Sequence, residues 1–291
     1  QMKKTTLYLS LIVSFLCFST QIKAQDQSDS TGLPGDNFSL EGALNLFKQA
    51  SSPEDFEKML NTESNHVNNL DLNEDGDIDY IRVISKMEQD VHAFILQVPI
   101  SESENQDIAV IELEKNGKES AVIQIIGDED IFGVQQIVEP SEEGDMKGDM
   151  KMEPRTKSGP SPLNYEVDDA IVINVWPWPC VRFVYAPAYR PWVSPWRWRV
   201  YPSYWHPWMP LGWRVFHPFR ARYRPGFAVV HTHRVVHAHR VYTPVRTTSV
   251  TVNRRHGANV KSYRVTRTKT TVTGPRGKTK TTRTTTRVKR R

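Results

Sequence analysis

The chain contains no Asp or Glu after Asp169, so its last 122 residues carry 25 Lys and Arg and no acidic side chain. All 33 acidic residues lie in residues 1–169, the acidic half, which holds only 13 of the 38 basic ones. The net charge of +5 is therefore the sum of a strongly negative half and a strongly positive half. Such an asymmetry bears on binding partners more than on fold. We expect the basic half, residues 170–291, to attract polyanions, including the acidic half of its own or a neighbouring copy.

Long apolar runs are scarce as well. A membrane-spanning helix needs about 20 apolar residues, whereas the apolar stretch at residues 7–18 is shorter and no later segment is long enough. With the basic Lys3 and Lys4 before it and the small Ala24 after it, this stretch predicts a secretory signal peptide over residues 2–24. We therefore expect an exported protein, located in a periplasm, on an outer-membrane surface or outside the cell, that does not span the membrane.

The chain has two cysteines, Cys17 and Cys180, and Cys17 lies within the expected signal peptide. Cys180 is expected to be an unpaired thiol packed among aromatic residues; the alternative is an intermolecular disulfide in an oxidising compartment. The sequence contains no phosphate-binding loop, no Gly-x-Ser-x-Gly elbow and no zinc-protease motif. No carboxylate lies close to Cys180 in sequence to orient a histidine base. These absences favour a protein that is not an enzyme.

Composition divides the rest of the chain into five stretches. Residues 25–37 are polar and contain Gly and Pro, which predicts a disordered lead-in. Residues 38–139 are typical of a compact acidic domain, and residues 140–164 have the composition of a linker. Residues 165–242 form a basic region rich in Trp, Pro, Arg and His. Residues 243–291 form a tail rich in Thr, Lys and Arg, which we expect to be largely disordered.

Two short helices are predicted at the start of the acidic domain. Apolar residues between positions 40 and 47 fall on one face of a helix that begins near Ser39. A second helix has Ser52 as its N-cap and Pro53 at its first position, followed by two acidic residues.

After these helices the apolar period changes to two. This alternation predicts strands at residues 80–86, 92–100, 107–114 and 120–126. Asn116-Gly117 predicts a tight turn between the last two strands. Helices followed by an antiparallel meander give an α+β fold. A Trp/Pro/Arg-rich β or extended region and the basic tail would follow.

Tryptophan, proline and arginine dominate the first part of the basic half. Proline at this density excludes a long helix or a central strand and leaves a short edge ribbon or a polyproline-like chain. Trp favours the membrane–water interface and Arg pairs with phosphate, and the composition resembles that of tryptophan- and arginine-rich membrane-active peptides. The candidate residues for binding a polyanion or membrane surface are Trp176, Trp178, Trp192, Trp196, Arg197, Trp198, Arg199, Trp205, Trp208 and Trp213.

Two alternatives exist for this aromatic segment. Its rings could stack on single-stranded nucleic acid, or the Trp residues could pack into the core of a small module laid on the acidic domain.

The sharpest local motif is the sequence Asp-Leu-Asn-Glu-Asp-Gly-Asp-Ile-Asp at residues 71–79. Oxygen-bearing side chains occupy alternate positions and glycine occupies the sixth. The motif resembles the calcium loops of EF-hand, dockerin and integrin-type propeller repeats, in which a tight loop curls around the ion. The ligands that this resemblance implies are Asp71, Asn73, Asp75, the backbone carbonyl of Asp77, and Asp79.

The loop departs from an EF-hand in that Arg82 stands where the bidentate Glu belongs, and a strand follows instead of a helix. We therefore expect weak calcium binding with a structural role, because five acidic side chains in nine residues repel one another without a cation. The alternative is an acidic turn that binds nothing.

Histidines alternate within residues 227–252, where the pattern is typical of a strand. On one continuous strand they would share a face, and such pairs can hold zinc, copper or nickel. No carboxylate or thiolate lies nearby in sequence, and Arg234 and Arg240 disfavour a cation. A transition-metal site is therefore less favoured than a polar strand face or a pH-responsive increase in positive charge. The histidines are His231, His233, His237 and His239.

The overall layout resembles that of uncharacterised exported bacterial proteins, on the basis of residues 71–130 and 171–246. We expect a non-enzymatic, exported calcium-binding protein whose basic aromatic half associates with an anionic envelope surface, either lipopolysaccharide or acidic polysaccharide. One alternative is sequence-nonspecific nucleic-acid binding. Another is self-association, with the acidic and basic halves neutralising each other within a chain or between chains.

Overall fold

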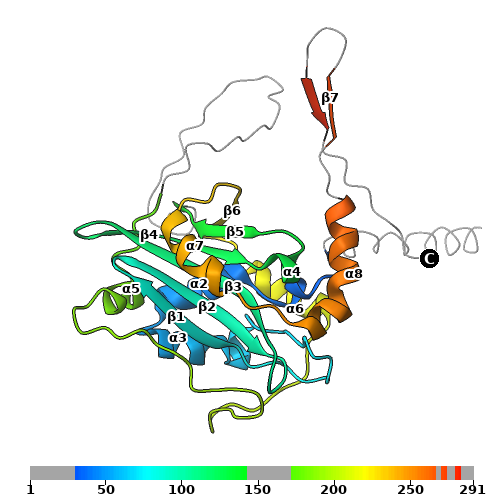
Figure 1. The fold of residues 1–291 in the computed structure, drawn as a ribbon, viewed down its shortest axis with the longest axis horizontal. Coiled ribbons are helices and arrows are strands. Elements are labelled where there is room, and N and C mark those ends of the chain that lie inside the picture. Colours follow the sequence, from blue (N-terminus) through cyan, green and yellow to red (C-terminus); the bar gives the residue numbers. More distant parts are fainter. Residues whose placement is uncertain (1–29, 143–171, 267–269, 274–278, 283–291) are drawn as a thin grey trace, which may run out of the picture. The chain divides into compact units, whose positions relative to one another are not determined.

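The computed structural model describes residues 30–142, 172–266, 270–273 and 279–282 (Figure 1). The predicted signal peptide at residues 2–24 lies outside the described residues, as do most of the predicted linker and the end of the predicted tail. From Thr31 onward the described residues belong to one compact unit.

Residues 31–37 are not the disordered lead-in that the sequence predicted. They end in a 3-10 helix, η2 (Pro34–Asn37), and Asp36 accepts hydrogen bonds from the backbone nitrogens of Thr31 and Gly32 at 2.7 and 2.9 Å. Leu33 is buried in this turn. Burial of Leu33 and closure of the turn by Asp36 outweigh the polar composition of the segment.

The two predicted helices are confirmed. They are α2 (Leu40–Gln49) and α3 (Pro53–Leu60). The hydroxyl of Ser39 accepts a hydrogen bond from the backbone nitrogen of Gly42 at 3.0 Å, and the hydroxyl of Ser52 accepts one from Asp55 at 3.1 Å. These serines satisfy backbone donors in the first turn of each helix, which a helix cannot satisfy internally.

A six-stranded antiparallel sheet confirms the α+β class and the four predicted strands. The strands are β1 (Arg82–Glu88), β2 (Val91–Pro99), β3 (Asn105–Gly117), β4 (Ser120–Gly127), β5 (Gln136–Pro140) and β6 (Phe227–Val230), and they pair in chain order. Two features differ from the prediction. The tight turn between β3 and β4 lies at residues 118–119, after a register shift at Lys115, and not at Asn116-Gly117. The last strand, β6, comes from the basic half.

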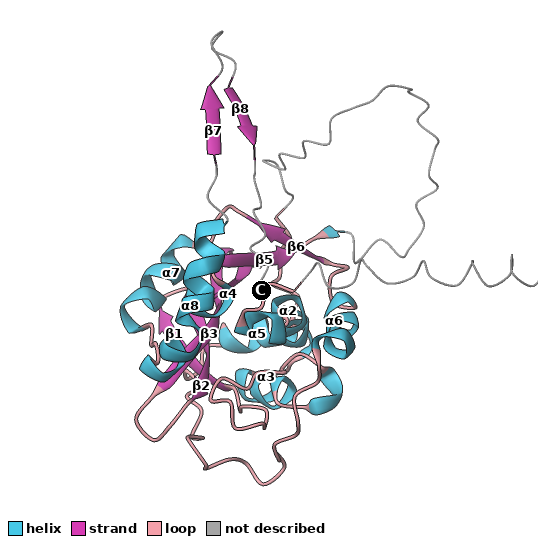
Figure 2. Cartoon of the chain, turned by 90° about the vertical axis from the view of Figure 1, so that its right-hand side faces the viewer, coloured by secondary structure: helices cyan, strands magenta, loops and turns pink. Residues whose placement is uncertain are grey.

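The two faces of the sheet differ in size and polarity. One face is apolar and packs against α2, α3 and α5 (Pro179–Val184), with Ile111 and Leu113 of β3 in this core. The opposite face has a small apolar cluster that includes Val110, with Glu112 beside it in the strand, and α7 (Val236–Tyr242) covers it. Figure 2 shows α7 on one side of the strands and α2, α3 and α5 on the other, while α8 (Val250–Thr266) contributes Val252 to the large apolar core.

The Trp-rich segment follows the edge of β1. Its helices are short, as the proline content predicted: α5 has six residues, and α6 (Trp213–Ala221) has nine. Between them, the backbone nitrogen of Ser85 donates to the carbonyl of Trp192 at 2.7 Å, and that of Ser194 donates to the carbonyl of Val83 at 3.0 Å. The segment thus occupies backbone groups that the free edge of the sheet would expose.

The histidine-containing segment is not a continuous strand. β6 ends at Val230, and α7 begins six residues later. Val235, Ala238 and Tyr242 are buried, and their spacing of three and four residues places them on one helical face. Burial of this face against the sheet favours a helix over the alternation seen in the sequence.

The segment predicted as a largely disordered tail begins with ordered elements: η5 (Thr243–Val245) and the 17-residue helix α8. The hydroxyl of Ser249 accepts a hydrogen bond from the backbone nitrogen of Val252 at 3.2 Å at the start of α8. A hairpin of β7 (Thr270–Thr273) and β8 (Thr279–Thr282) follows. None of the helices that the structure describes combines the length and the apolar character needed to cross a membrane.

Candidate functional site

A buried carboxylate on the sheet face under α7 holds two histidines of the basic half. Glu112 lies in β3 and has no exposed surface. Its Oε2 atom lies 2.6 Å from Nε2 of His233, and its Oε1 atom lies 2.7 Å from Nδ1 of His239. The two imidazole rings meet edge to face, with centroids 4.4 Å apart. Within the described ranges, these three residues are the one group of His, Cys, Asp and Glu whose ligand atoms converge within 4.8 Å.

Glu114, two residues further along β3, positions the start of α7. Its Oε1 atom accepts a hydrogen bond from the backbone nitrogen of Ala238 at 2.8 Å, and its Oε2 atom lies 3.1 Å from Nδ1 of His237. Residues i and i+2 of a strand share a face. Glu112 and Glu114 therefore contact successive parts of the same histidine-rich segment.

On the neighbouring strand, Gln124 fixes the segment just before α7. Its side-chain oxygen accepts a hydrogen bond from the backbone nitrogen of Arg234 at 2.8 Å, and its nitrogen donates to the carbonyl of Thr232 at 3.0 Å. The Arg234 guanidinium donates to Glu139 at 3.2 Å. His233 is thus held between two anchored backbone groups, and the positive charge of Arg234 is paired.

The structure divides the four predicted histidines. His233 and His239 join Glu112, His237 lies against Glu114 and is exposed, and His231 is exposed and outside the cluster. No carboxylate lies nearby in sequence, but β3 supplies two from more than a hundred residues away. The hydrogen bond to Glu112 raises the pKa of His239, since the carboxylate favours the protonated ring.

The acidic loop at residues 71–79 has the backbone of a tight turn, with Gly76 at a φ of +90° that favours glycine. Its side chains bond to the loop itself. Asp71 accepts hydrogen bonds from the backbone nitrogens of Asp75 and Gly76 at 3.1 and 3.0 Å, and Asp75 accepts one from Asp77 at 3.0 Å. The carboxylates are directed inward along the turn, as in an Asx turn. Calcium binding by this loop stays a prediction.

Asp79, the last residue of the loop, is buried. It accepts hydrogen bonds from the backbone nitrogen of Leu72 at 2.6 Å and from the Asn73 amide at 3.2 Å. Burial first, and then the charges of Asp71 and Asp75, raise the pKa of Asp79 to about 8. A cation in the loop would relieve this cost, because it would favour the ionised carboxylate.

The Trp-rich segment packs inward through a buried carboxylate on α3. Glu57 accepts hydrogen bonds from the indole nitrogen of Trp192 at 3.0 Å and from the hydroxyl of Ser194 at 2.7 Å. Its pKa is raised by burial despite these bonds. Trp178 and Trp205 are buried, so these two predicted binding residues face away from solvent. The reason is their large apolar area: Trp178 belongs to the large apolar core, and Trp205 packs against Tyr80 and Tyr201.

The other six Trp residues are partly buried, whereas the two predicted arginines, Arg197 and Arg199, are exposed. Large apolar side chains are exposed in the same segment, including Phe183 and Met209. We define the arginine face as the exposed arginines of this segment that form no ion pair with any described residue. They are Arg182, Arg190, Arg197, Arg199, Arg214, Arg222 and Arg224.

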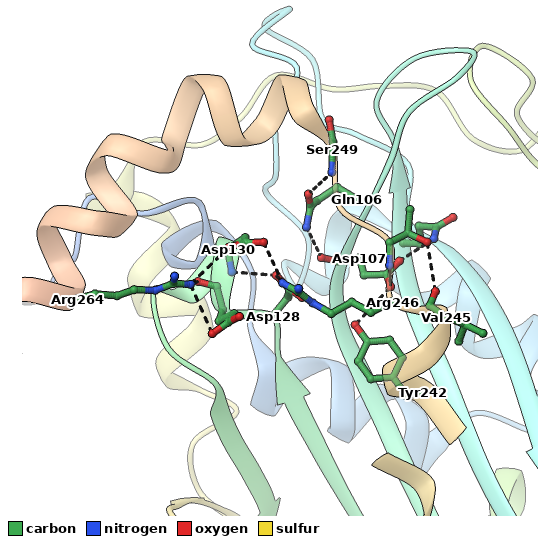
Figure 3. A network of polar contacts seen from close by, with 12 residues as sticks. Gln106, Asp107, Asp128, Asp130, Tyr242, Val245, Arg246, Ser249 and Arg264 are labelled. Carbon is green, nitrogen blue, oxygen red and sulfur yellow. Dashed lines mark hydrogen bonds and ion pairs between the residues drawn. The ribbon is translucent and has the colours of Figure 1, made fainter. Parts of the chain in front are cut away.

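A second group of arginines is bound to the acidic half (Figure 3). Arg246 donates to both carboxylate oxygens of Asp128, at 2.6 and 3.0 Å, and to Asp130 at 2.9 Å. Arg264 of α8 donates to the carbonyl of Gly133 at 2.7 Å and lies 3.4 Å from Asp130. Planar guanidinium groups suit this bidentate contact, and together they attach the segment around α8 to the start of α4 (Glu129–Phe132).

Asp107 belongs to the same network and binds the chain between α7 and α8 (Figure 3). It accepts hydrogen bonds from the backbone nitrogen of Thr247 at 2.9 Å, from Tyr242 at 3.3 Å and from Gln97 at 2.6 Å. Burial raises its pKa to about 6. We call five of the carboxylates that contact α7 or the chain after it the docking face; they are Asp107, Glu112, Glu114, Asp128 and Asp130.

Sequence reasoning missed the docking face. Its only signal was the presence of Glu112, Glu114 and Gln124 at alternate positions of β3 and β4, a pattern that is equally typical of a solvated sheet face. No family model matches the chain, and no curated protein or solved structure matches it either.

Proposed function

We propose that this protein is a non-enzymatic, exported protein whose arginine face binds the anionic surface of a cell envelope. The observation that supports this proposal is the division of the arginines. Arg234, Arg246 and Arg264 are paired with the acidic half, whereas the arginine face is exposed and lies in a part of the chain without acidic residues.

The ligand class follows from the chemistry of the arginine face. Arginine binds phosphate in a bidentate manner, and exposed apolar side chains such as Phe183 and Met209 suit the boundary between lipid head groups and acyl chains. Phosphorylated lipid, such as lipopolysaccharide, offers both partners. In this proposal the buried and partly buried Trp residues anchor the segment that carries the arginine face. Calcium bound to the loop at residues 71–79 rigidifies the acidic domain.

The test is co-sedimentation of the full chain with vesicles that carry lipopolysaccharide or an anionic phospholipid, and with neutral vesicles. The full chain is required because β6 completes the sheet of the acidic half. A surface arginine contributes about 1 kcal/mol to binding an anionic membrane, so R197Q/R199Q should weaken binding by about 10- to 30-fold.

The matched control is K86Q/K118Q, which removes the same charge from exposed positions of the acidic half. It should change the affinity less than the arginine variant does. Equal losses in both variants, or binding to neutral vesicles of the same strength, would contradict the proposal. Preferential binding of DNA in competition with vesicles would favour the nucleic-acid alternative.

A further inference from the structure

The cluster of Glu112, His233 and His239 has the composition of a metal site. Two imidazoles and one carboxylate are borderline ligands that suit zinc and its neighbours among the divalent transition metals. Calcium, by contrast, prefers six to eight oxygen ligands. The side chain of Glu112 is fully buried, while those of His233 and His239 are 22% and 26% exposed.

The spacing of the ligand atoms is close to what an ion requires. The nitrogen atoms of His233 and His239 lie 2.6 and 2.7 Å from the oxygens of Glu112. A tetrahedral ion with bonds of about 2.0–2.1 Å separates its ligand atoms by about 3.3 Å. One ligand atom from each of the three residues lies within 4.8 Å of the others, so entry of an ion requires only small shifts, which side-chain rotation can provide.

The elements that carry the ligands are fixed. Glu112 lies inside the sheet, and Glu114 holds the start of α7 through the backbone nitrogen of Ala238. Gln124 holds the backbone on both sides of His233. Ligands on anchored backbone lose little conformational freedom when the ion binds.

The charge of the surroundings also fits a cation. Arg234, which on sequence grounds disfavours a cation, is paired with Glu139. Glu112 and Glu114 bring two carboxylates to this face. A divalent ion would compensate the buried charge of Glu112, which in the ion-free arrangement depends on two imidazoles.

From this geometry we propose that Glu112, His233 and His239 form a binding site for one divalent transition-metal ion of the zinc class. Three protein ligands come from β3, the segment before α7, and α7. A fourth coordination position would be filled by water, as in zinc sites with three protein ligands. Such an ion would crosslink the acidic and basic halves independently of any envelope ligand.

The test is calorimetric titration of the full, metal-free chain with zinc, supported by cobalt absorption spectra that report the coordination geometry. The wild type should bind one equivalent of zinc. H233A and H239A should each weaken binding by at least about 100-fold, since each removes a ligand. E112Q should do the same, and circular dichroism will show whether each variant remains folded.

The matched controls are H231A and H237A, which remove an imidazole from the same segment but outside the group of three. They should keep zinc affinity within about threefold of the wild type. Absence of zinc binding by the wild type would overturn the proposal. Equal losses in H231A and H233A would also overturn it, as would loss of the zinc site in D75A, because the ion would then be bound elsewhere.

Discussion

The acidic loop at residues 71–79 and the docking face both gather carboxylates, but they neutralise them differently. In the loop, Asp71 and Asp75 accept hydrogen bonds from backbone nitrogens at most five residues away. On the docking face, Glu112 and Asp128 contact His233, His239 and Arg246, which lie at least 118 residues away. The loop contacts the basic half through the exposed pair of Glu74 and Arg255, and its Asp side chains bond to its own backbone. The docking face uses its charge to hold the basic half in place.

The difference teaches how a chain with segregated charges can fold as one unit. The histidines and arginines after Asp169 that pair with a carboxylate, such as His233 and Arg246, find it across the fold, because none is available nearby in sequence. Buried, hydrogen-bonded ion pairs are costly to break once formed. The docking face therefore contributes to stability and position, whereas the loop is the region where an added ion has most effect.

The largest expected effect concerns Arg246, the partly buried arginine that pairs with the buried Asp128 of the docking face. R246A removes the partner of Asp128, a side chain that is only 2% exposed, and leaves it uncompensated. We expect a loss of about 3 kcal/mol in the free energy of unfolding, measured by urea denaturation. The control is R255A, whose partner Glu74 is 58% exposed; we expect a loss below about 1 kcal/mol. Equal losses in the two variants would contradict the distinction between docking face and loop.

The pH dependence of stability should identify Asp107 as a second buried member of the docking face. Its pKa is about 6 in the folded chain against 3.8 for an ordinary Asp. The folded state therefore binds the proton more tightly, so this group adds stability as pH falls from about 7 to about 4. Wild type should gain about 2 kcal/mol relative to D107N over this range, measured by denaturation at each pH. A constant difference between the two proteins would show that Asp107 titrates normally.

A smaller effect is expected from calcium in the acidic loop. At a concentration ten times the dissociation constant, calcium should stabilise the full chain by about 1.4 kcal/mol, measured as a shift in thermal unfolding. D75A should abolish the shift, whereas D90A, at an exposed position outside the loop, should keep it. Persistence of the shift in D75A would place the calcium elsewhere and leave the loop as an acidic turn.

Much of the acidic domain was predictable because its signals are local. Ser39 and Ser52 cap their helices through hydroxyl groups within three residues of their partners, and the alternation in β1 to β4 reflects one buried sheet face. The turn between β3 and β4 was misplaced by two residues because a register shift follows Lys115. The alternation of residues at positions 231–239 wrongly predicted a strand. Burial of Val235, Ala238 and Tyr242 against the sheet favours the helix α7 instead.

The sequence by itself determined the α+β class, the first two helices, four of the strands and the separation of acidic from basic residues. Each of these depends on neighbours a few positions apart, or on composition alone. Only the tertiary structure decided that Glu112 meets His233 and His239, that Trp178 and Trp205 are buried, and which arginines are paired. The physical reason is that these contacts join side chains more than a hundred residues apart, so their partners exist only when the sheet has formed and α7 covers its second face.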